Sequence, residues 1–267
     1  MEQSSKVAVI GAGVMGEALI VALISSGLSA DQIIISEKRE DRAQELVAKY
    51  SITAASLQQS VADADALLLV VKPQDMSAVL SEIKSVVKRD CLIISFAAGK
   101  TRSFISDGLG TENQVVRVMP NSPTLIGKGM AAVSMGSGVS PAQRSFVLGF
   151  LGATGKVIEV GEELQDAVTA TSGSGPAYFF AFVEAMIVGA TELGLSQEDA
   201  TVLTIQTIVG AAALLDQSGQ SATKLRENVT SPNGTTAAAL SVFAEDDMKS
   251  IVTKAMEAAR DRSRELA

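Results

Sequence analysis

Short apolar runs alternate with amphipathic stretches through the first 160 residues of the chain. Apolar runs bounded by polar residues predict strands, and apolar positions recurring every three or four residues predict helices. Alternating strands and helices indicate an α/β fold with a doubly wound parallel sheet of the Rossmann type. The expected strands are Lys6–Ile10, Gln32–Ile35, Ala66–Val71, Cys91–Phe96, Gln114–Met119, Gly129–Ser134 and Lys156–Val160. The expected helices are Glu17–Ser26, Glu40–Lys49, Gln74–Lys88 and Pro141–Leu151.

Beyond residue 160 the strand pattern stops and only helical periodicity follows. The sequence therefore predicts two domains, an α/β domain at residues 1–160 and an all-α domain at residues 161–267. Residues 177–215 are too apolar for a small helical domain to bury alone, so we expect a subunit interface there. The expected helices are Gly161–Thr171, Pro176–Leu193, Ser196–Ser218, Ser221–Asn228, Thr235–Glu245 and Met248–Glu265.

The composition excludes several classes of protein. A formal net charge of −8 argues against nucleic acid as a partner, because phosphate binding needs a basic surface. The longest apolar stretch, residues 176–190, contains Glu184 and is shorter than the roughly 20 residues that cross a bilayer. The N-terminal residues lack the basic region and the cleavage site of a signal peptide. We expect a soluble, cytoplasmic protein that does not bind membranes.

Histidine is absent, and Cys91 is the single cysteine. The chain therefore lacks the commonest metal ligand and the commonest general acid–base group, and we expect no metal site. Because Cys91 lies in an apolar run, we expect a buried, inert thiol in a reducing compartment. Any catalysis must proceed without imidazole.

A glycine-rich turn follows the first expected strand and precedes the first expected helix. In the dinucleotide fingerprint the first glycine makes the turn, the second lets a pyrophosphate approach, and the third lets helix and strand pack closely. The alternative is a tight turn without a ligand. We expect a dinucleotide to bind at Gly11, Ala12, Gly13, Val14, Met15 and Gly16.

The end of the second strand bears on the choice between the two nicotinamide coenzymes. NAD-binding proteins usually place an acidic side chain there, which holds the ribose 2′-hydroxyl. Here Ser36 ends the strand, and Glu37, Lys38 and Arg39 follow. The two cations could meet the 2′-phosphate of NADPH or be solvated surface, whereas Glu37 would oppose that phosphate or bind the ribose of NADH. We expect Ser36, Lys38 and Arg39 to bind NADPH, with NADH as the alternative.

Three further strand ends meet at the edge of the sheet where open α/β folds bind ligands. Lys72 could reach the adenosine side of the coenzyme or be an exposed charge. Small residues at 97–99 would let the nicotinamide riboside lie close, and Asn121 could donate a hydrogen bond or stabilise a rigid turn. The cofactor-binding residues expected at this edge are Val71, Lys72, Pro73, Ala97, Ala98, Gly99 and Asn121.

Two hydroxyl-rich turns, Ser172–Pro176 and Thr230–Thr236, each lead into an apolar helical segment. Each contains a proline of the kind that a first helical turn accepts. The free N–H groups at a helix start, with hydroxyls nearby, form an anion site. We therefore expect a small carboxylate ligand at these turns and a coenzyme phosphate at the glycine turn.

Several sequence motifs follow one another along nearly the whole chain in the order that is typical of the pyrroline-5-carboxylate reductases. By these motifs the chain resembles that family. The resemblance implies reduction of 1-pyrroline-5-carboxylate to L-proline by NADPH or NADH, the last step of proline biosynthesis. It also implies a substrate-binding helical domain that dimerises, with dimers often gathered into larger rings such as a decamer. The motifs are the glycine turn, VKPQ at Val71–Gln74, SFAAG at Ser95–Gly99, VVRVMPNSP at Val115–Pro123, DAVTATSGSGPAYFF at Asp166–Phe180 and VTSPNGTTAAAL at Val229–Leu240.

The resemblance also implies roles for the residues of the second hydroxyl-rich turn. Its backbone N–H groups would bind the substrate carboxylate, Thr236 would hydrogen-bond the ring nitrogen, and Ser231 would place a second hydroxyl near the carboxylate. Asn233 stands where the family usually has a second glycine, and asparagine tolerates the left-handed region better than most residues. The expected catalytic residues are Thr236 and Ser231, and the expected substrate-binding residues are Ser174, Gly175, Asn233, Gly234, Thr235 and Thr236.

A protonated cyclic imine accepts hydride without an acid supplied by the enzyme, which suits a chain without histidine. Catalysis would then depend on proximity and orientation, with Thr236 positioning the ring nitrogen, capping a helix, or doing both. A β-hydroxyacid dehydrogenase, the nearest alternative, would need a lysine base, but Lys224, Lys249 and Lys254 stand in charged surroundings. A non-catalytic dinucleotide sensor, the second alternative, would leave the hydroxyl-rich turns unexplained.

Overall fold

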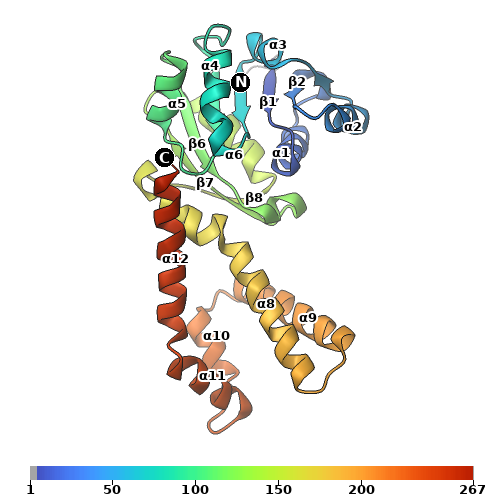
Figure 1. Cartoon of the computed structure of the whole chain (residues 1–267), viewed down its shortest axis with the longest axis vertical. Helices are drawn as coiled ribbons and strands as arrows, with labels where there is room; N and C mark the ends of the chain where they lie inside the picture. The colour runs from blue at the N-terminus through green and yellow to red at the C-terminus, as the bar shows by residue number, and fades with distance from the viewer. Residues whose placement is uncertain (1–4, 267) are drawn as a thin grey trace. The chain divides into compact units, whose positions relative to one another are not determined.

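The computed structural model describes residues 5–266, whose contacts form two compact units (Figure 1). The sheet unit comprises the residues up to Ser174 together with those from Ala258 onward, and the helical unit comprises Gly175–Glu257. This division differs from the expected boundary at residue 160, because the helical segment after the sheet and the last turns of the C-terminal helix contact each other and belong to the sheet unit.

An eight-stranded sheet, ordered β3-β2-β1-β4-β5-β6-β7-β8, is the centre of the sheet unit. β1 to β6 are parallel, which confirms the predicted doubly wound architecture, but β7 is antiparallel to β6 and β8 is parallel to β7. The all-parallel prediction was wrong here because residues 120–128, which join β6 to β7, are fewer than the dozen or so that a parallel crossover needs. The strands are β1 Val7–Ile10, β2 Ile33–Ser36, β3 Thr53–Ala54, β4 Ala66–Leu69, β5 Leu92–Ser95, β6 Val115–Met119, β7 Gly129–Met135 and β8 Gly155–Glu159.

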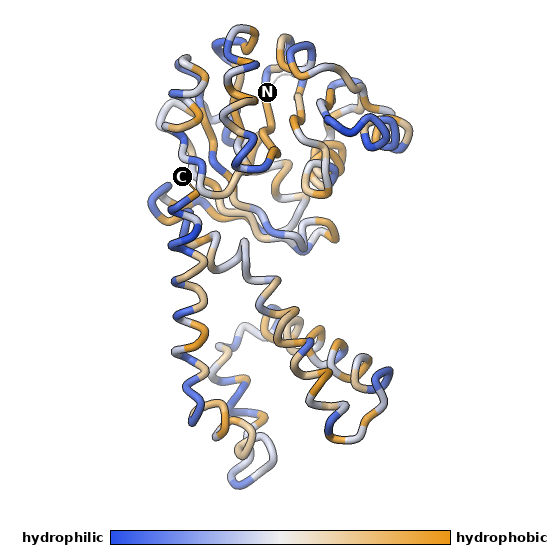
Figure 2. Tube along the Cα trace, viewed as in Figure 1, coloured by the Kyte–Doolittle hydropathy of each residue, from blue (hydrophilic) through white to orange (hydrophobic). Residues whose placement is uncertain are grey.

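Helices cover both faces of this sheet. They are α1 Val14–Ser25, α2 Glu40–Tyr50, α3 Leu57–Ala62, α4 Met76–Ile83, α5 Arg102–Leu109, α6 Pro141–Gly152 and α7 Gln165–Val168. Val7 and Val9 of β1 pack into a core with α1 and α6, whereas Ala8 and Ile10 pack into a second core with α4 and α5. Side chains alternate between the two faces of a strand, so one strand serves both cores. Figure 2 shows the hydrophobic residues concentrated on these strands.

Cys91 lies in the second core and is fully buried, as expected. Burial raises the pKa of its thiol to about 12, so the reactive thiolate is scarce at neutral pH. The strand β3 and the helices α3 and α5 were not predicted, since they are only two, six and eight residues long.

The helical unit contains the elements that the sequence predicts. They are α8 Gly175–Glu192, α9 Gln197–Gln217, α10 Ala222–Asn228, α11 Thr235–Glu245 and the first turns of α12 Met248–Glu265. Large apolar side chains remain exposed on α8 and α9, among them Phe179 at 65 % and Val202 at 63 %. Figure 2 colours much of both helices as hydrophobic. By length and composition, Glu162–Glu192 and Gln197–Gln217 could cross a membrane, which corrects the expectation that the apolar stretch is too short.

Candidate functional site

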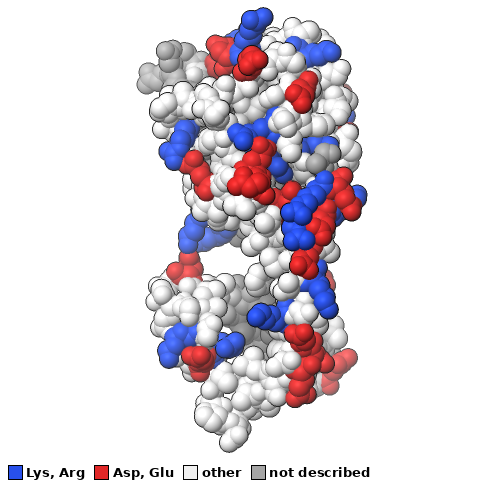
Figure 3. Space-filling model, turned by 90° about the vertical axis from the view of Figure 1, so that its left-hand side faces the viewer, with Lys and Arg blue, Asp and Glu red and all other residues white. Residues whose placement is uncertain are grey.

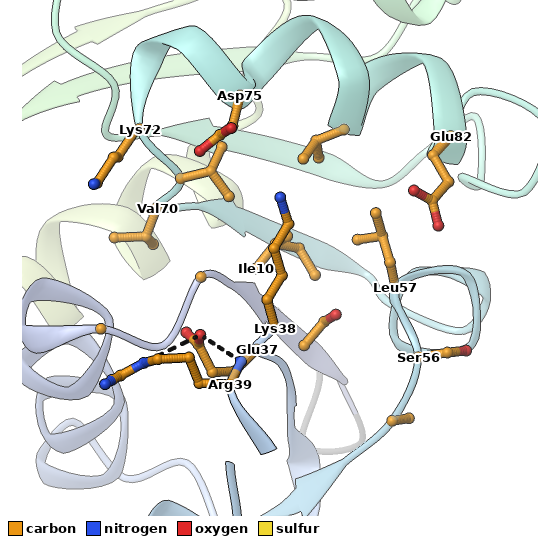
Figure 4. Close-up of a pocket in the computed structure, with 16 residues that line it drawn as sticks. Ile10, Glu37, Lys38, Arg39, Ser56, Leu57, Val70, Lys72, Asp75 and Glu82 are labelled. Carbon is orange, nitrogen blue, oxygen red and sulfur yellow. Dashed lines mark hydrogen bonds and ion pairs between the residues drawn. The ribbon is translucent and has the colours of Figure 1, made fainter. Parts of the chain in front are cut away.

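A cavity of about 540 Å³ opens at the carboxyl ends of β1, β2 and β4 (Figure 4). The predicted cofactor-binding residues that line it are Gly11, Gly13, Ser36, Lys38, Arg39, Val71 and Lys72. Sequence reasoning did not assign the rest of the lining, which includes the segment after β3 and one face of α4. For α4 a signal was available, because this helix follows the expected strand at residues 66–71, whereas the two-residue strand β3 could not be detected in the sequence. The additional residues are Ile10, Glu37, Ala55, Ser56, Leu57, Val70, Asp75, Val79 and Glu82.

The three glycines of the fingerprint have different surroundings. Gly11 has a φ of +88°, and a Cβ there would lie 2.9 Å from the carbonyl oxygen of Val70, so the fold itself requires this glycine. A Cβ on Gly16 would collide with the carbonyl oxygen of Gly11. A Cβ on Gly13, by contrast, would meet no atom within 4 Å. Gly13 lines the cavity, so the open space beside it can hold a ligand.

Glu37 faces the glycine turn, and its carboxylate is bound within the protein. One oxygen accepts a hydrogen bond from the N–H of Ala12 at 2.9 Å, and the other accepts one from the N–H of Arg39 at 3.1 Å. The Nε atom of Arg39 lies 4.0 Å from the second oxygen. Each oxygen keeps further acceptor capacity, so the choice between a ribose hydroxyl and a 2′-phosphate beside Glu37 stays a prediction. Figure 4 shows Lys38 extending toward the middle of the cavity, with Lys72 and Asp75 on the facing wall.

The loop after β5 lies outside this cavity and packs against the end of α12. Gly99 has a φ of +75°, and a Cβ there would lie 2.7 Å from the carbonyl oxygen of Ser263. This close approach explains the glycine without a ligand, so the expected contact with a nicotinamide riboside stays a prediction. The predicted cofactor-binding residues that do not line the cavity are Ala12, Val14, Met15, Gly16, Pro73, Ala97, Ala98, Gly99 and Asn121.

The first hydroxyl-rich turn is not the helix start that the sequence predicts. Thr169–Gly173 forms a π-helical turn between α7 and α8, and the N–H of Ser174 donates to the carbonyl of Thr169 at 2.8 Å. Pro176 has no N–H for the carbonyl of Ser172 one helical turn before it. The Nδ2 atom of Asn121 donates to that carbonyl at 3.0 Å instead. The proline is therefore accommodated inside a continuous helical segment, and no free helix terminus forms here.

Asn121 thus has a structural role that the sequence left open. Its Oδ1 atom accepts a hydrogen bond from the N–H of Met130 at 2.8 Å, while its Nδ2 binds the π-turn. The side chain joins the loop after β6 to β7 and to the helical segment. Ser174 and Gly175, the expected substrate-binding residues, lie at the end of this π-turn.

The second hydroxyl-rich turn forms a true helix start in the helical unit. Asn233 has a φ of +57°, in the left-handed region that asparagine tolerates. Gly234 is the N-cap of α11, its N–H donates to the carbonyl of Ser231 at 3.0 Å, and it has no side chain to cap the helix. Thr236 is consequently the second residue of the helix, so the expectation that it caps the helix was wrong. The first N–H groups of α11 are open to an anion.

The doubly wound sheet, with a cavity beside a glycine turn at its carboxyl edge, defines a dinucleotide-binding protein. A family model described as pyrroline-5-carboxylate reductase dimerisation matches residues 162–266, and one described as NADP oxidoreductase, coenzyme F420-dependent, matches residues 6–99. The chain belongs to the pyrroline-5-carboxylate reductase family, whose curated members are similar to it over its full length.

Individual relatives agree with this assignment. The pyrroline-5-carboxylate reductase of Pseudomonas aeruginosa is 41% identical over 98% of this chain and 97% of its own length. The solved structure of the Coxiella burnetii enzyme matches with a TM-score of 0.90 at 34% identity, covering 99% of each chain. The Plasmodium falciparum enzyme, solved with NADP bound, matches with a TM-score of 0.89 at 28% identity over 100% of this chain and 99% of that one.

The family assignment confirms the function that the resemblance implied, an NAD(P)H-dependent reductase of 1-pyrroline-5-carboxylate in proline biosynthesis. It excludes the two alternative functions considered from the sequence, a β-hydroxyacid dehydrogenase and a non-catalytic dinucleotide sensor. The match of residues 162–266 to a dimerisation domain also supports self-association through the helical region.

Proposed function

We propose that the cavity of the sheet unit binds the adenosine side of NADPH, and that the turn Ser231–Thr236 binds the carboxylate of 1-pyrroline-5-carboxylate. The observation that carries the substrate assignment is the start of α11, where Gly234 leaves the first N–H groups without a side-chain cap. Such N–H groups, at the positive end of the helix dipole, favour a carboxylate. Asn233 takes the backbone conformation that the turn requires, so the departure from the family's glycine does not disturb this assignment.

The chemistry needs little acid–base assistance. The bound coenzyme supplies a hydride to the imine carbon, and the imine nitrogen, already protonated, receives the electron pair of the C=N bond and becomes the amine of proline. The chain's task is to hold the imine in place, which is a large source of rate enhancement. Thr236 is half-buried at the second position of α11, and its hydroxyl would position the ring nitrogen. Ser231 would place a second hydroxyl near the carboxylate.

Replacing Thr236 tests this assignment. Thr236→Ala should raise the KM for the imine or lower kcat by roughly tenfold, the size expected for one hydrogen bond to a charged group. The Kd for NADPH should not change, and Thr236→Ser should retain most of the activity. Steady-state rates follow from the absorbance of the reduced nicotinamide. Thr223→Ala, an exposed threonine of α10, is the matched control, and unchanged imine kinetics in Thr236→Ala would remove this residue from the site.

We propose NADPH as the preferred coenzyme. Lys38 and Arg39 line the cavity, and the carboxylate of Glu37 is turned toward the N–H groups of Ala12 and Arg39, so the two cations can meet a 2′-phosphate. Lys38→Ala should therefore raise the KM for NADPH roughly tenfold and leave that for NADH nearly unchanged, because only NADPH carries the phosphate. Lys84→Ala, an exposed lysine at the end of α4, is the control. Equal effects on both coenzymes would contradict the proposal.

We propose that a second copy of the chain, and not a membrane, covers the exposed apolar side chains of α8 and α9. The dimerisation model that matches this region supports a dimer, and we propose that such dimers gather into larger rings such as a decamer. Acidic and basic side chains are interspersed over the visible face in Figure 3, and the net charge is −8, so nucleic acid is not a partner that we propose. The cytoplasm suits an enzyme of amino-acid biosynthesis with a single buried thiol.

A further inference from the structure

The peptide groups on both sides of Ala12, in the middle of the glycine turn, are held by charged side chains. The N–H of Ala12 donates to a carboxylate oxygen of Glu37 at 2.9 Å. Its carbonyl oxygen accepts a hydrogen bond from the Nε atom of Arg42 at 3.3 Å. Glu37 follows β2, whereas Arg42 comes from α2, so elements outside the turn fix its backbone from two sides.

Arg42 is itself held in place. Its guanidinium binds the carboxylate of Glu17, in the first turn of α1, and that of Glu45 at 2.8 Å. Its side chain is only 11% exposed, and that of Glu17 is 19% exposed. Glu17 also accepts hydrogen bonds from Lys49 at 2.9 Å and from the hydroxyl of Tyr50 at 2.7 Å. This group, here called the Arg42 cluster, ties α2 to the start of α1.

The charge of Glu17 matters because of where it lies. Burial disfavours the charged carboxylate, but hydrogen bonds from Tyr50, Lys49 and Arg42 outweigh that effect and lower its pKa to about 2. Glu17 is therefore ionised at neutral pH, one position after Gly16 at the helix start that a pyrophosphate would approach. Arg42 and Lys49 neutralise this carboxylate, which would otherwise repel the phosphates.

We propose that Arg42 is a positioning residue for the coenzyme pyrophosphate: it fixes the carbonyl of Ala12 and, together with Lys49, neutralises Glu17, without touching the coenzyme. Arg42 is absent from the lining of the cavity, so it acts through the turn. The inference rests on the proposal that the glycine turn binds the pyrophosphate. It adds that coenzyme affinity depends on a residue of α2 that belongs to no glycine-turn motif.

The test is the affinity of the full-length enzyme for NADPH. Arg42→Ala should raise the Kd for NADPH about tenfold, as expected when a hydrogen bond to a charged group is lost. The KM for NADPH should rise in parallel, while kcat and the KM for the imine stay within about twofold, since neither depends on how the turn is held. Arg42→Lys keeps the charge beside Glu17 but loses the fork that reaches several partners, so it should recover part of the affinity. Fluorescence titration of NADPH gives Kd directly.

Controls separate this role from a general loss of stability. Arg144→Ala removes an exposed ion pair with Glu159 in the same unit and should leave the Kd unchanged. The titrations are made well below the thermal midpoint of each variant, so that every sample is folded. An unchanged Kd in Arg42→Ala, or an equal rise in Arg144→Ala, overturns the inference. Suppose that Arg42→Ala leaves the Kd unchanged. If Gly13→Val leaves it unchanged too, the assignment of the pyrophosphate to the glycine turn is wrong. If Gly13→Val abolishes NADPH binding, that assignment stands and only the role proposed for Arg42 is wrong.

Discussion

Gly13→Val should abolish NADPH binding in a protein that still folds. The φ of Gly13 is −65°, which any residue can adopt, and a Cβ there meets no protein atom within 4 Å. The protein without coenzyme therefore has space for the β-carbon that valine adds. The same space is the one that the pyrophosphate would fill, so the two isopropyl methyl groups would displace it. We expect the Kd for NADPH to rise at least about 100-fold, a loss of roughly 3 kcal/mol.

The measurement is a titration of NADPH, combined with circular dichroism to show that the fold is retained. Gly149→Val is the matched control, because a Cβ at this exposed position of α6 also meets nothing within 4 Å. Gly16→Val should behave differently from both, since its Cβ would collide with the carbonyl of Gly11 and unfold the turn. Normal NADPH binding by a folded Gly13→Val protein would contradict the phosphate assignment.

Most of the fold can be predicted from the sequence because strands and helices have different periods. The strand β1 lies within one residue of its expected bounds, and α11 matches them. The direction of β7 cannot be read from a period, because an apolar run looks the same in either orientation. The length of the connection at residues 120–128 does indicate the direction of β7, because it is too short for a parallel crossover. Similarly, β3 is only two residues long and has no periodicity to detect.

The candidate site is less predictable because its details depend on long-range contacts. The glycine turn is a local motif and could be found, but nothing local shows that Glu37 binds the N–H of Ala12, 25 positions away. The same limit applies to Ser172, whose carbonyl is satisfied by Asn121 across 51 positions. Because the sequence alone does not show this hydrogen bond, Pro176 indicates a helix start there. The proline signal was sound, but the side chain of Asn121, in the loop after β6, supplied the missing donor.

Arg117→Leu should destabilise the protein by about 3 kcal/mol, because Asp166 and Glu162 lose their most buried cation and keep only Arg264 and Arg102. Arg117 lies on β6 with 5% of its surface exposed, 3.6 Å from Asp166 and 3.9 Å from Glu162. Burial lowers the pKa of its guanidinium, although both carboxylates favour the charged form. An arginine nevertheless stays protonated at neutral pH. Leucine would leave the carboxylates facing an apolar side chain.

The side chains around Arg117 also contact the end of α12. Two measurements can therefore detect the loss of Arg117. Asp166 accepts a hydrogen bond from the hydroxyl of Ser263 at 2.7 Å, and the carbonyl of Ser263 lies beside Gly99. Urea unfolding should show the loss of stability, and hydrogen exchange should show faster opening of residues 258–266.

Arg144→Ala, which breaks an exposed ion pair, should lower the free energy of unfolding by less than about 1 kcal/mol. Adding Asp166→Asn to Arg117→Leu should recover part of the stability, because it removes a carboxylate whose remaining cation, Arg264, is 60% exposed and 3.8 Å away. A double variant no more stable than Arg117→Leu would indicate that packing, and not charge, makes Arg117 necessary.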